Sequence, residues 1–450
     1  MVLFMRVKNV SLIYPNRFKG GISSLAMHIL HNHLNSYKDI VCKMHFLENY
    51  KDIKNKDAII ITLQYENDYF NVVNIINHLK KNNPNGIFIG GGPCAIGNPL
   101  PLSDYFDAFV IGEIEGTDIM YNLINGNFDI KDGVYLPKDM GKINREEFKK
   151  IKRIYPKKLD TTDYPTYQYT HKDSAYGKAY LLEIGRGCPR RCKFCMARAI
   201  YYPPRFRKLD DLKYLVDEGF KYTDVDKVAL ISPSVGDYRH ILDICQYILE
   251  KSEKLNKNIE ISPSSIRPDT ITEELLSLLN VKTLTLGIES GSEELRNHIM
   301  KDISNEDIYN AIDIGRRFNI NKVKLYFMVG LPNESDEDIN EIIKMIGNIR
   351  KNFKKVEVSV NPFIPKPFTD FEYERFDING KNKIKYIVKS TKGFGNVSIS
   401  YDNFNSSIIQ CVLSRGAHEL GPLLEYKPTQ FLKYLKKNNL LNKYLEGENV

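Results

Sequence analysis

The sequence predicts an α/β protein in which a doubly wound, Rossmann-like domain precedes a partial barrel of six parallel strand–helix units. Three observations lead to this fold class. Short apolar runs alternate with helical patterns over about the first 120 residues, and the alternation returns near residue 176 for six more units. The chain of 450 residues is also longer than one hydrophobic core normally supports.

Four segments are expected along the chain. Residues 1–125 form the Rossmann-like domain and 176–368 the barrel, whereas 369–450 form a small C-terminal α/β extension. Residues 126–175 are rich in Lys, Asp, Tyr and Pro and show little periodicity, which is typical of a linker. A helix predicted at 428–445 has an apolar stripe that we expect to dock on the body of the protein.

The elements of the N-terminal domain follow from apolar runs and turn signals. The run at 58–63 is continuously apolar, as in a strand buried on both faces. Serines at the start of 23–34 favour a helix cap there. Ligands of doubly wound domains bind at the carboxyl ends of the strands. The predicted strands are 10–14, 58–63, 86–89 and 108–111, and the predicted helices are 23–34 and 67–80.

The barrel is predicted from a longer series of the same kind. Its working face is expected at the carboxyl ends of the strands. The predicted strands are 179–187, 228–231, 259–261, 283–288, 323–329 and 356–360. The predicted helices are 209–218, 240–255, 271–279, 308–318 and 336–353.

Composition narrows the class of protein. Hydrophobic residues make up 42% and charged residues 27%, which is ordinary globular usage. No run approaches the roughly 20 apolar residues of a membrane span, and the N-terminus lacks a signal-peptide pattern. We therefore expect a cytoplasmic protein with no membrane contact. The net charge of +8 is mild for this length, so a nucleic-acid partner is not expected.

Three of the seven cysteines lie within eight residues, in the segment GRGCPRRCKFC. Cys188, Cys192 and Cys195 follow a predicted strand, and Gly185 and Gly187 permit a sharp turn before them. Thiolates suit zinc and iron–sulfur clusters. Structural zinc takes four ligands, and no Cys or His at the usual spacing supplies a fourth, so zinc is the less favoured alternative.

The Cys-x-x-x-Cys-x-x-Cys spacing, with Phe194 before the last cysteine, resembles that of the radical S-adenosylmethionine (radical SAM) enzymes. The resemblance implies that Cys188, Cys192 and Cys195 hold an oxygen-sensitive [4Fe-4S] cluster. It also implies that the amino and carboxylate groups of S-adenosylmethionine chelate the fourth iron. A reductant protein of ferredoxin or flavodoxin type is then an expected partner.

Residues at the ends of later strands extend this resemblance. LGIESGSEELRNHIMK offers Glu289 and Ser290 for the ribose, and KLYFMVGLPNE places Gly330 beside the adenine. Arg267 suits a carboxylate, while Ser232 and Ser264 either meet the methionine part or fix loops. The resemblance thus implies an S-adenosylmethionine site of Phe194, Ser232, Ser264, Arg267, Glu289, Ser290 and Gly330.

The domain order resembles the cobalamin-binding members of the same family. YPNRFKGGISSL and IGGGPCAIGNP carry the likeness, and glycines at 90–92 remove side chains where a bulky group would lie. A glycine-rich turn without a ligand is the alternative. The implied cobalamin-binding residues are Asn16, Phe18, Gly21, Ser23, Leu63, Gln64, Tyr65, Gly90, Gly91, Gly92, Pro93, Gly112 and Glu113.

One departure from the family pattern concerns the cobalt ligand. Many cobalamin domains carry an Asp-x-His-x-x-Gly loop, and here Asn16 and Phe18 stand in the Asp and His places before Gly21. The cobalt would then lack a His ligand, which is expected to favour methyl transfer. Gln64 or Tyr65 is expected to cover the lower face of the cofactor.

The resemblance implies a cobalamin-dependent radical SAM methyltransferase. One S-adenosylmethionine would yield a 5′-deoxyadenosyl radical that takes hydrogen from an unactivated carbon, and methylcobalamin would methylate that carbon. A second S-adenosylmethionine would remethylate the cobalt. A peptide or protein side chain is the expected substrate, with carbon methylation of glutamine as one possibility. Arg415 and His418, in a tail segment also like the family's, are candidate substrate-side groups.

Three other functions stay open at this point. The same cofactors also serve ring formation or rearrangement. An RNA-modifying enzyme related to the methylthiotransferases is a second alternative, although the sequence has no second cysteine triad and no separate basic RNA-binding module. A cobalamin or redox sensor without turnover is the third.

Overall fold

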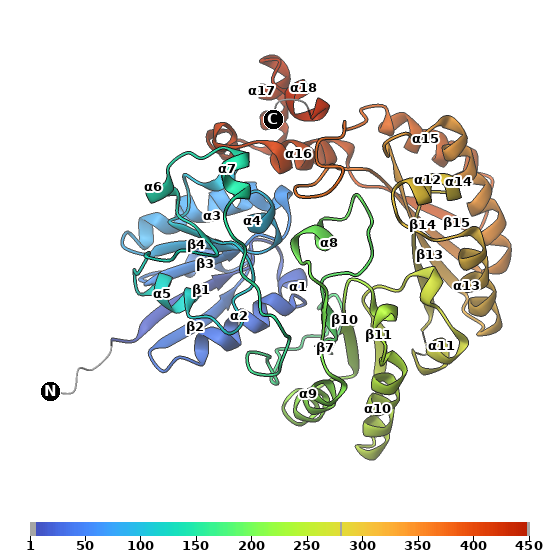
Figure 1. The fold of residues 1–450 in the computed structure, drawn as a ribbon, viewed down its shortest axis with the longest axis horizontal. Coiled ribbons are helices and arrows are strands. Elements are labelled where there is room, and N and C mark those ends of the chain that lie inside the picture. Colours follow the sequence, from blue (N-terminus) through green and yellow to red (C-terminus); the bar gives the residue numbers. More distant parts are fainter. Residues whose placement is uncertain (1–5, 280, 448–450) are drawn as a thin grey trace.

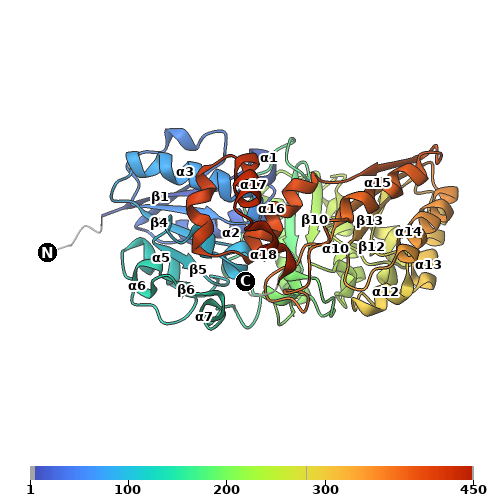
Figure 2. The same cartoon turned by 90° about the horizontal axis from the view of Figure 1, so that it is seen from above.

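A computed structural model describes residues 6–279 and 281–447. The N-terminal domain and the barrel lie side by side, and the C-terminal helices return to the N-terminal domain (Figures 1 and 2). The predicted α/β fold class is confirmed. In the part of the chain that the structure describes, no helix combines the length and the apolar character needed to cross a membrane.

The N-terminal sheet has the strand order β2-β1-β3-β4-β5-β6. Its first five strands are parallel, and β6 is antiparallel to β5. The chain passes from β1 to one side and then to the other, so the switch point lies between β1 and β3. The strands are β1 (Lys8–Ile13), β2 (Ile40–His45), β3 (Ala58–Thr62), β4 (Ile87–Gly91), β5 (Ala108–Val110) and β6 (Val134–Tyr135).

Helices cover both faces of this sheet. Met27 of α2 and Met120 of α5 join one hydrophobic core, whereas Val72 and Ile76 of α3 join another. The segment predicted as a linker adds β6, α6 and α7 to this domain. The helices are α1 (Phe18–Gly21), α2 (Leu25–Asn35), α3 (Tyr69–Asn82), α4 (Pro93–Gly97), α5 (Ile119–Ile124), α6 (Pro137–Met140) and α7 (Arg145–Lys149).

The barrel consists of two parallel sheets over one continuous core. Three strands stand in the order β11-β10-β7 and four in the order β12-β13-β14-β15, and among the described residues no ladder joins β11 to β12. The barrel is therefore open, as predicted. The strands are β7 (Ala179–Glu183), β10 (Lys227–Ile231), β11 (Glu260–Pro263), β12 (Thr283–Glu289), β13 (Lys322–Val329), β14 (Lys355–Pro362) and β15 (Val397–Ser400).

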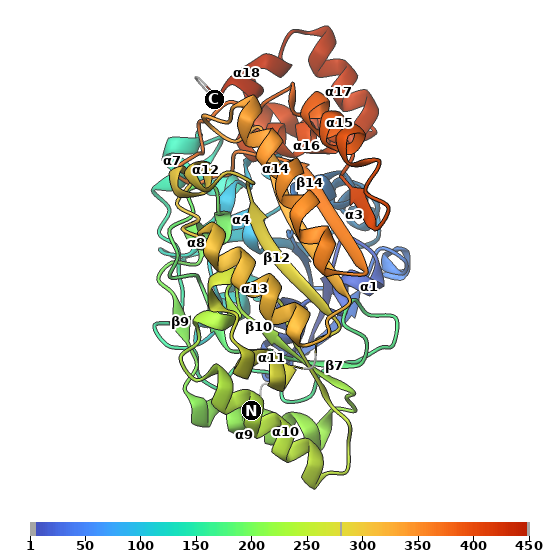
Figure 3. The same cartoon turned by 90° about the vertical axis from the view of Figure 1, so that its right-hand side faces the viewer.

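The outer layer of the barrel is helical (Figure 3). Ser304 and Ser335 begin two of its helices with capping boxes, in which side chains satisfy the first free backbone N–H groups. The sheet also continues past residue 368, because β15 pairs with β14. The helices are α9 (Leu209–Tyr222), α10 (Ile241–Lys254), α11 (Glu273–Leu279), α12 (Glu293–His298), α13 (Asn305–Arg317), α14 (Asp336–Ile349) and α15 (Gly380–Thr391).

The C-terminal helices α16 (Phe404–Arg415), α17 (Pro428–Lys437) and α18 (Leu441–Glu446) share a hydrophobic core with the N-terminal domain. Phe431 of α17 meets Phe70 of α3 edge to face at 5.4 Å between ring centres. The helix predicted at 428–445 is divided, because residues 438–440 leave the helical path and Asn439 has a φ of +56°.

Candidate active site

The cysteine segment is a closed loop between two short antiparallel strands. β8 (Gly185–Arg186) pairs with β9 (Arg205–Phe206), and α8 (Met196–Ile200) lies between them. Gly187 has a φ of +78°, and a Cβ there would stand 2.3 Å from the carbonyl oxygen of Tyr201. Only glycine satisfies both conditions, so the turn that precedes the first cysteine depends on it.

Arginine side chains tie the loop to the carboxyl ends of neighbouring barrel strands. Arg190 forms ion pairs with Asp237 at 2.5 Å and with Asp269 at 3.0 Å. Arg267 pairs with the same Asp269 at 2.9 Å and donates to the carbonyl oxygen of Lys301 at 2.7 Å. The loop is thereby held at the working face that the barrel prediction specified.

The three thiols lie close enough to influence one another. Burial raises the pKa of Cys188, Cys192 and Cys195, and each of these pKa values is raised further by the charge of another of the three. The positive charges of Arg267 and Lys301 oppose this rise, Arg267 at Cys188 and Cys192 and Lys301 at Cys192 and Cys195. Cationic surroundings of this kind favour bound thiolates.

The donor set fits an iron–sulfur cluster. Within residues 6–279 and 281–447, no three His, Cys, Asp or Glu side chains converge on a point where one metal ion would be held. In a cluster each thiolate binds a different iron, so its ligands need not converge on one point. Three mutually interacting thiols on one loop are consistent with that arrangement.

Several predicted S-adenosylmethionine residues lie around this loop. Phe194 packs against a small apolar cluster that contains Leu331, the residue after Gly330. Gly330 has a φ of +77°, as the predicted turn requires. Glu289 forms an ion pair with Lys301 at 2.9 Å, and its negative charge raises the pKa of Cys192.

The remaining predicted residues of this set are engaged within the protein. The hydroxyl of Ser264 donates to the carbonyl oxygen of Ser232 at 3.0 Å and accepts from its N–H at 3.2 Å. Ser290 accepts from the N–H of Ser292 at 3.2 Å. Arg267, expected to face a ligand carboxylate, pairs with Asp269. The contacts of Ser232 and Ser264 with each other fit the loop-fixing alternative.

A cavity of about 350 Å³ lies between the N-terminal domain and the cysteine loop. Its walls come from α2, from the carboxyl ends of β3, β4 and β5, and from residues beside the cysteines. The predicted cofactor residues that line it are Gln64, Gly90, Gly91, Gly92, Pro93, Gly112 and Glu113, together with Ser232.

The three consecutive glycines of this cavity, Gly90, Gly91 and Gly92, differ in the space that a Cβ would find. A Cβ at Gly92 would stand 3.0 Å from the carbonyl oxygen of Leu63, and one at Gly90 would stand 2.7 Å from the ring of Phe109. At Gly91 the nearest atom would be 4.0 Å away. Only Gly91 therefore leaves open space, and the other two are required by the packing of the protein itself.

Six of the predicted cobalamin residues do not border the cavity. Asn16 donates to Asp68 at 2.7 Å, and Phe18 packs against Phe46 and His171. The side chains of Asn16 and Phe18 are thus engaged within the protein. The six are Asn16, Phe18, Gly21, Ser23, Leu63 and Tyr65.

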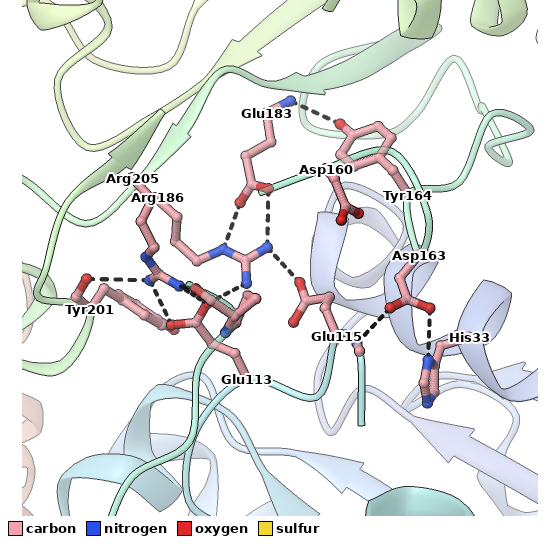
Figure 4. Close-up of polar contacts among 12 residues, drawn as sticks. His33, Glu113, Glu115, Asp160, Asp163, Tyr164, Glu183, Arg186, Tyr201 and Arg205 are labelled. Carbon is pink, nitrogen blue, oxygen red and sulfur yellow. Dashed lines mark hydrogen bonds and ion pairs between the residues drawn. The ribbon is translucent and has the colours of Figure 1, made fainter. Parts of the chain in front are cut away.

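Arg186, two residues before Cys188, is the centre of a buried ion network on the cavity wall (Figure 4). It pairs with Glu113 and Glu115 of the N-terminal domain, both at 2.7 Å, and with Glu183 of the barrel at 2.8 Å. Arg205 pairs with Glu113 at 2.8 Å. The network therefore joins the two domains at the point where the cysteine loop begins.

The charges of this network balance. Arg207 pairs with Glu183 at 2.8 Å, so three guanidinium groups face three carboxylates. Burial alone would raise the pKa of Glu183, but the charges and hydrogen bonds of Arg186 and Arg207 lower it to about 2. Sequence reasoning assigned no role to Arg186, although it lies inside the cysteine motif.

The candidate substrate-side groups of the tail are used structurally. Arg415 is buried and donates to the backbone carbonyls of Glu372 and Tyr444. His418 contacts the hydroxyl of Ser103 and the carbonyl oxygen of Ile143. Neither residue lines the cavity.

Sequence comparison assigns the family. Residues 182–346 match the model of the radical SAM superfamily, and residues 35–125 match the N-terminal model of radical SAM proteins. An uncharacterized protein of Methanocaldococcus jannaschii is 56% identical over 444 residues, which covers 98% of this chain and 96% of the relative. The chain belongs to the radical SAM superfamily. The membership predicted from the cysteine spacing is thereby confirmed.

Solved structures of radical SAM enzymes are similar to this chain in fold. TsrM from Kitasatospora setae, a methyltransferase solved with cobalamin and a [4Fe-4S] cluster, superposes with a TM-score of 0.60 over 82% of this chain and 74% of its own, at 15% identity. OxsB, a cobalamin-dependent enzyme solved with S-adenosylmethionine, gives 0.58 over 97% of this chain and 62% of its own, at 13% identity. These similarities establish a common fold.

Proposed function

We propose that this radical SAM protein is a cobalamin-dependent methyltransferase that acts on an unactivated carbon. The observation that carries the proposal is the cavity of about 350 Å³ between the N-terminal domain and the loop of Cys188, Cys192 and Cys195. A cofactor held there would lie beside the cluster site, between the two domains. Its walls are largely apolar side chains, which exclude water from reactive chemistry.

Each cofactor has a set of residues that suits it. Cys188, Cys192 and Cys195 would hold the cluster, and Glu289 with the turn at Gly330 would bind S-adenosylmethionine. The cobalamin would lie along the cavity wall formed by Gln64, Gly91, Pro93 and Glu113. When bound, these groups supply reductive cleavage of S-adenosylmethionine and a transferable methyl group.

The chain's own residues would orient these groups. Arg186 joins the cavity wall to the cysteine loop through Glu113 and Glu115, so it would fix the separation between the two cofactor sites. The balanced charges of the network leave no net charge at the cavity from these six groups. Such preorganised surroundings suit a reaction that must avoid water.

The substrate we propose is a peptide or protein side chain, with glutamine as one candidate. The reductant would be a protein of ferredoxin or flavodoxin type in the cytoplasm. A methyl-sized mass increase on a cellular protein, lost when the gene is deleted, would support this substrate. If no protein gains such a mass and a small molecule does, the substrate part of the proposal fails.

Anaerobic reconstitution tests the cofactors. Protein supplied with iron, sulfide and cobalamin should retain one cluster of four iron atoms and one cobalt atom per protein chain. Cys192→Ala should abolish release of 5′-deoxyadenosine, whereas Cys245→Ala, a buried cysteine of α10, should preserve it. Failure to bind cobalamin would refute the proposal.

Product analysis separates methyl transfer from ring formation or rearrangement. Methyl transfer with remethylation of cobalamin should yield one S-adenosylhomocysteine and one 5′-deoxyadenosine for each product. Formation of 5′-deoxyadenosine without S-adenosylhomocysteine would instead support ring chemistry.

A further inference from the structure

The segment around Lys301 has an unusual backbone. Met300 and Asp302, on either side of it, have φ values of +52° and +49°, and Glu289 opposite has +71°. Non-glycine residues rarely adopt this left-handed conformation, and they keep it only where the surrounding structure enforces it. Two residues in this conformation are therefore the chain neighbours of Lys301, and the third is its ion-pair partner.

Two buried arginines hold this segment in place. Arg296 is fully buried and donates to the carbonyl oxygens of Ile303 at 2.7 Å and Ser290 at 2.9 Å. Arg267 donates to the carbonyl oxygens of Lys301 at 2.7 Å and Asp302 at 3.2 Å. Side chains from two places in the barrel thus fix a short turn.

The turn is also bonded directly to the cysteine loop. The N–H of Lys193, next to Cys192, donates to the carbonyl oxygen of Ile299 at 3.0 Å. A movement of the turn would therefore displace the cysteine loop, and the reverse holds as well.

The ammonium group of Lys301 is aimed inward. Its side chain is 11% exposed and its Nζ lies 2.9 Å from Oε1 of Glu289. A Cβ on Gly287 would stand 3.0 Å from Glu289 Oε1 and 3.5 Å from Lys301 Nζ, so the absence of a side chain there leaves room for the pair. The positive charge reaches Cys192 and Cys195, where it opposes the effect of burial on the pKa of both thiols.

We propose that Lys301 is a fixed counter-charge that raises the reduction potential of the cluster, and that Glu289 sets how much of this charge the cluster experiences. In the reduction step the reductant protein loses one electron and the cluster site becomes more negative by one unit. A largely buried cation, on a turn that is hydrogen-bonded to the cysteine loop, stabilises the more negative state. The inference rests on radical SAM membership and does not require cobalamin.

Redox titration of the anaerobically reconstituted full-length protein, followed by electron paramagnetic resonance before S-adenosylmethionine is added, tests this role. Lys301→Met should lower the potential so that the reduced-to-oxidised ratio at fixed ambient potential falls about tenfold, or 59 mV for one electron. Glu289→Gln should raise the potential, because it removes the opposing negative charge. The opposite signs are the signature of an electrostatic role.

The matched control is Lys322→Met. Lys322 pairs with Glu357 at 2.9 Å, the same separation as Lys301 and Glu289, but at the amino-terminal ends of β13 and β14. The potential should not change in this variant. Lys301→Arg, which keeps the charge, should keep a potential close to that of the unaltered protein.

Iron and sulfide content distinguish an electrostatic from a merely structural role. If Lys301→Met retains its iron with an unchanged potential, the inference is overturned. If this variant loses its cluster, Glu289→Gln decides, since an unchanged or lowered potential there also overturns the inference. Loss of methyl transfer alone would bear on the proposed function and leave this inference intact.

Discussion

Gly91 and Gly112 both line the cavity, but they differ in the space that a Cβ would find at each position. Gly112 has a φ of +139°, and a Cβ there would stand 2.1 Å from the carbonyl oxygen of Ile154. Gly91 would place a Cβ 4.0 Å from Val110. The first glycine is therefore required by the fold, whereas a Cβ at the second would meet no close neighbour.

Alanine at these two positions should separate the two requirements. Gly112→Ala should lower the free energy of unfolding by about 3 kcal/mol, because the new side chain meets backbone and the φ value disfavours it. Gly91→Ala should leave stability within about 1 kcal/mol but weaken cobalamin binding at least fivefold. Urea unfolding and a cobalamin titration measure the two effects. Equal loss of stability in both variants would contradict this distinction.

Asp68 predicts a pH dependence of stability. Its side chain is buried, Oδ2 has no hydrogen-bond partner among the described residues, and burial raises its pKa from 3.8 to about 6. The protonated form therefore stabilises the fold at low pH, and this contribution is lost as pH rises from about 4 to about 6.

Asp68→Asn should consequently match the unaltered protein at pH 4 and exceed it at pH 8. After allowance for solvent screening, we expect a gain of about 1–2 kcal/mol in the free energy of unfolding at pH 8. Urea unfolding at both pH values measures the difference in free energy between the variant and the unaltered protein. The contributions of other titrating groups are common to both proteins and cancel in this difference. A difference independent of pH would contradict the assignment.

At the scale of elements, the two-stranded ribbon β8–β9 connects the cysteine loop to the N-terminal domain. Arg186 lies on β8 and Arg205 on β9, and both pair with Glu113 beyond the end of β5. Buried pairs of this kind fix relative position more than they add stability, but removal of one partner leaves a buried charge unpaired.

Arg186→Met should therefore lower the free energy of unfolding by about 3–5 kcal/mol. The matched control is Arg316→Met, which removes an exposed pair with Asp313 on α13 and should change stability by less than about 1 kcal/mol. Denaturant unfolding measures both variants. Similar small effects in the two would show that the network is not needed to join the domains.

The elements that sequence reasoning found are those with a strong local pattern. β3 is buried along its whole length, as the apolar run at 58–63 predicts. β2 was not predicted, because it is a sheet edge whose Val41 and Lys43 are exposed while Cys42 is buried. The break between α17 and α18 was missed because an Asn in the left-handed conformation leaves no apolar signature.

The site was predictable to the extent that its residues are adjacent in sequence. The cysteine triad and the turn at Gly330 are local motifs, and the structure places both on the working face. The ion network was not predictable, because Glu113 and Arg205 are 92 residues apart and meet only when two domains dock. The pairing of Lys301 with Glu289 likewise depends on the strained turn between them.

At the scale of the whole molecule, the chain returns to the domain where it began. Phe431, Leu432 and Leu435 of α17 are buried in a core that also contains Phe70 and Leu79 of α3. The C-terminal helices therefore complete the N-terminal domain and are not an independent unit.

Truncation of the chain after Tyr426 should lower the free energy of unfolding of the whole protein. Loss of the three buried side chains of α17 removes on the order of 5 kcal/mol, a large share of an ordinary folding free energy. Thermal melting followed by circular dichroism should show a much lower midpoint. Leu440→Ala, at an exposed leucine, should leave the midpoint nearly unchanged. A truncated chain that melts normally would contradict the shared core.

The shared core of α3 and α17 also affects folding during synthesis, because α3 cannot pack on α17 until α17 has been synthesised. A ribosome that adds about 5–20 residues per second needs some tens of seconds to pass from α3 to α17. During that time the outer face of α3 has no α17 to pack against, and the whole barrel is synthesised. Nascent chains should therefore expose the apolar side chains of α3 that pack on α17 until α17 has been synthesised.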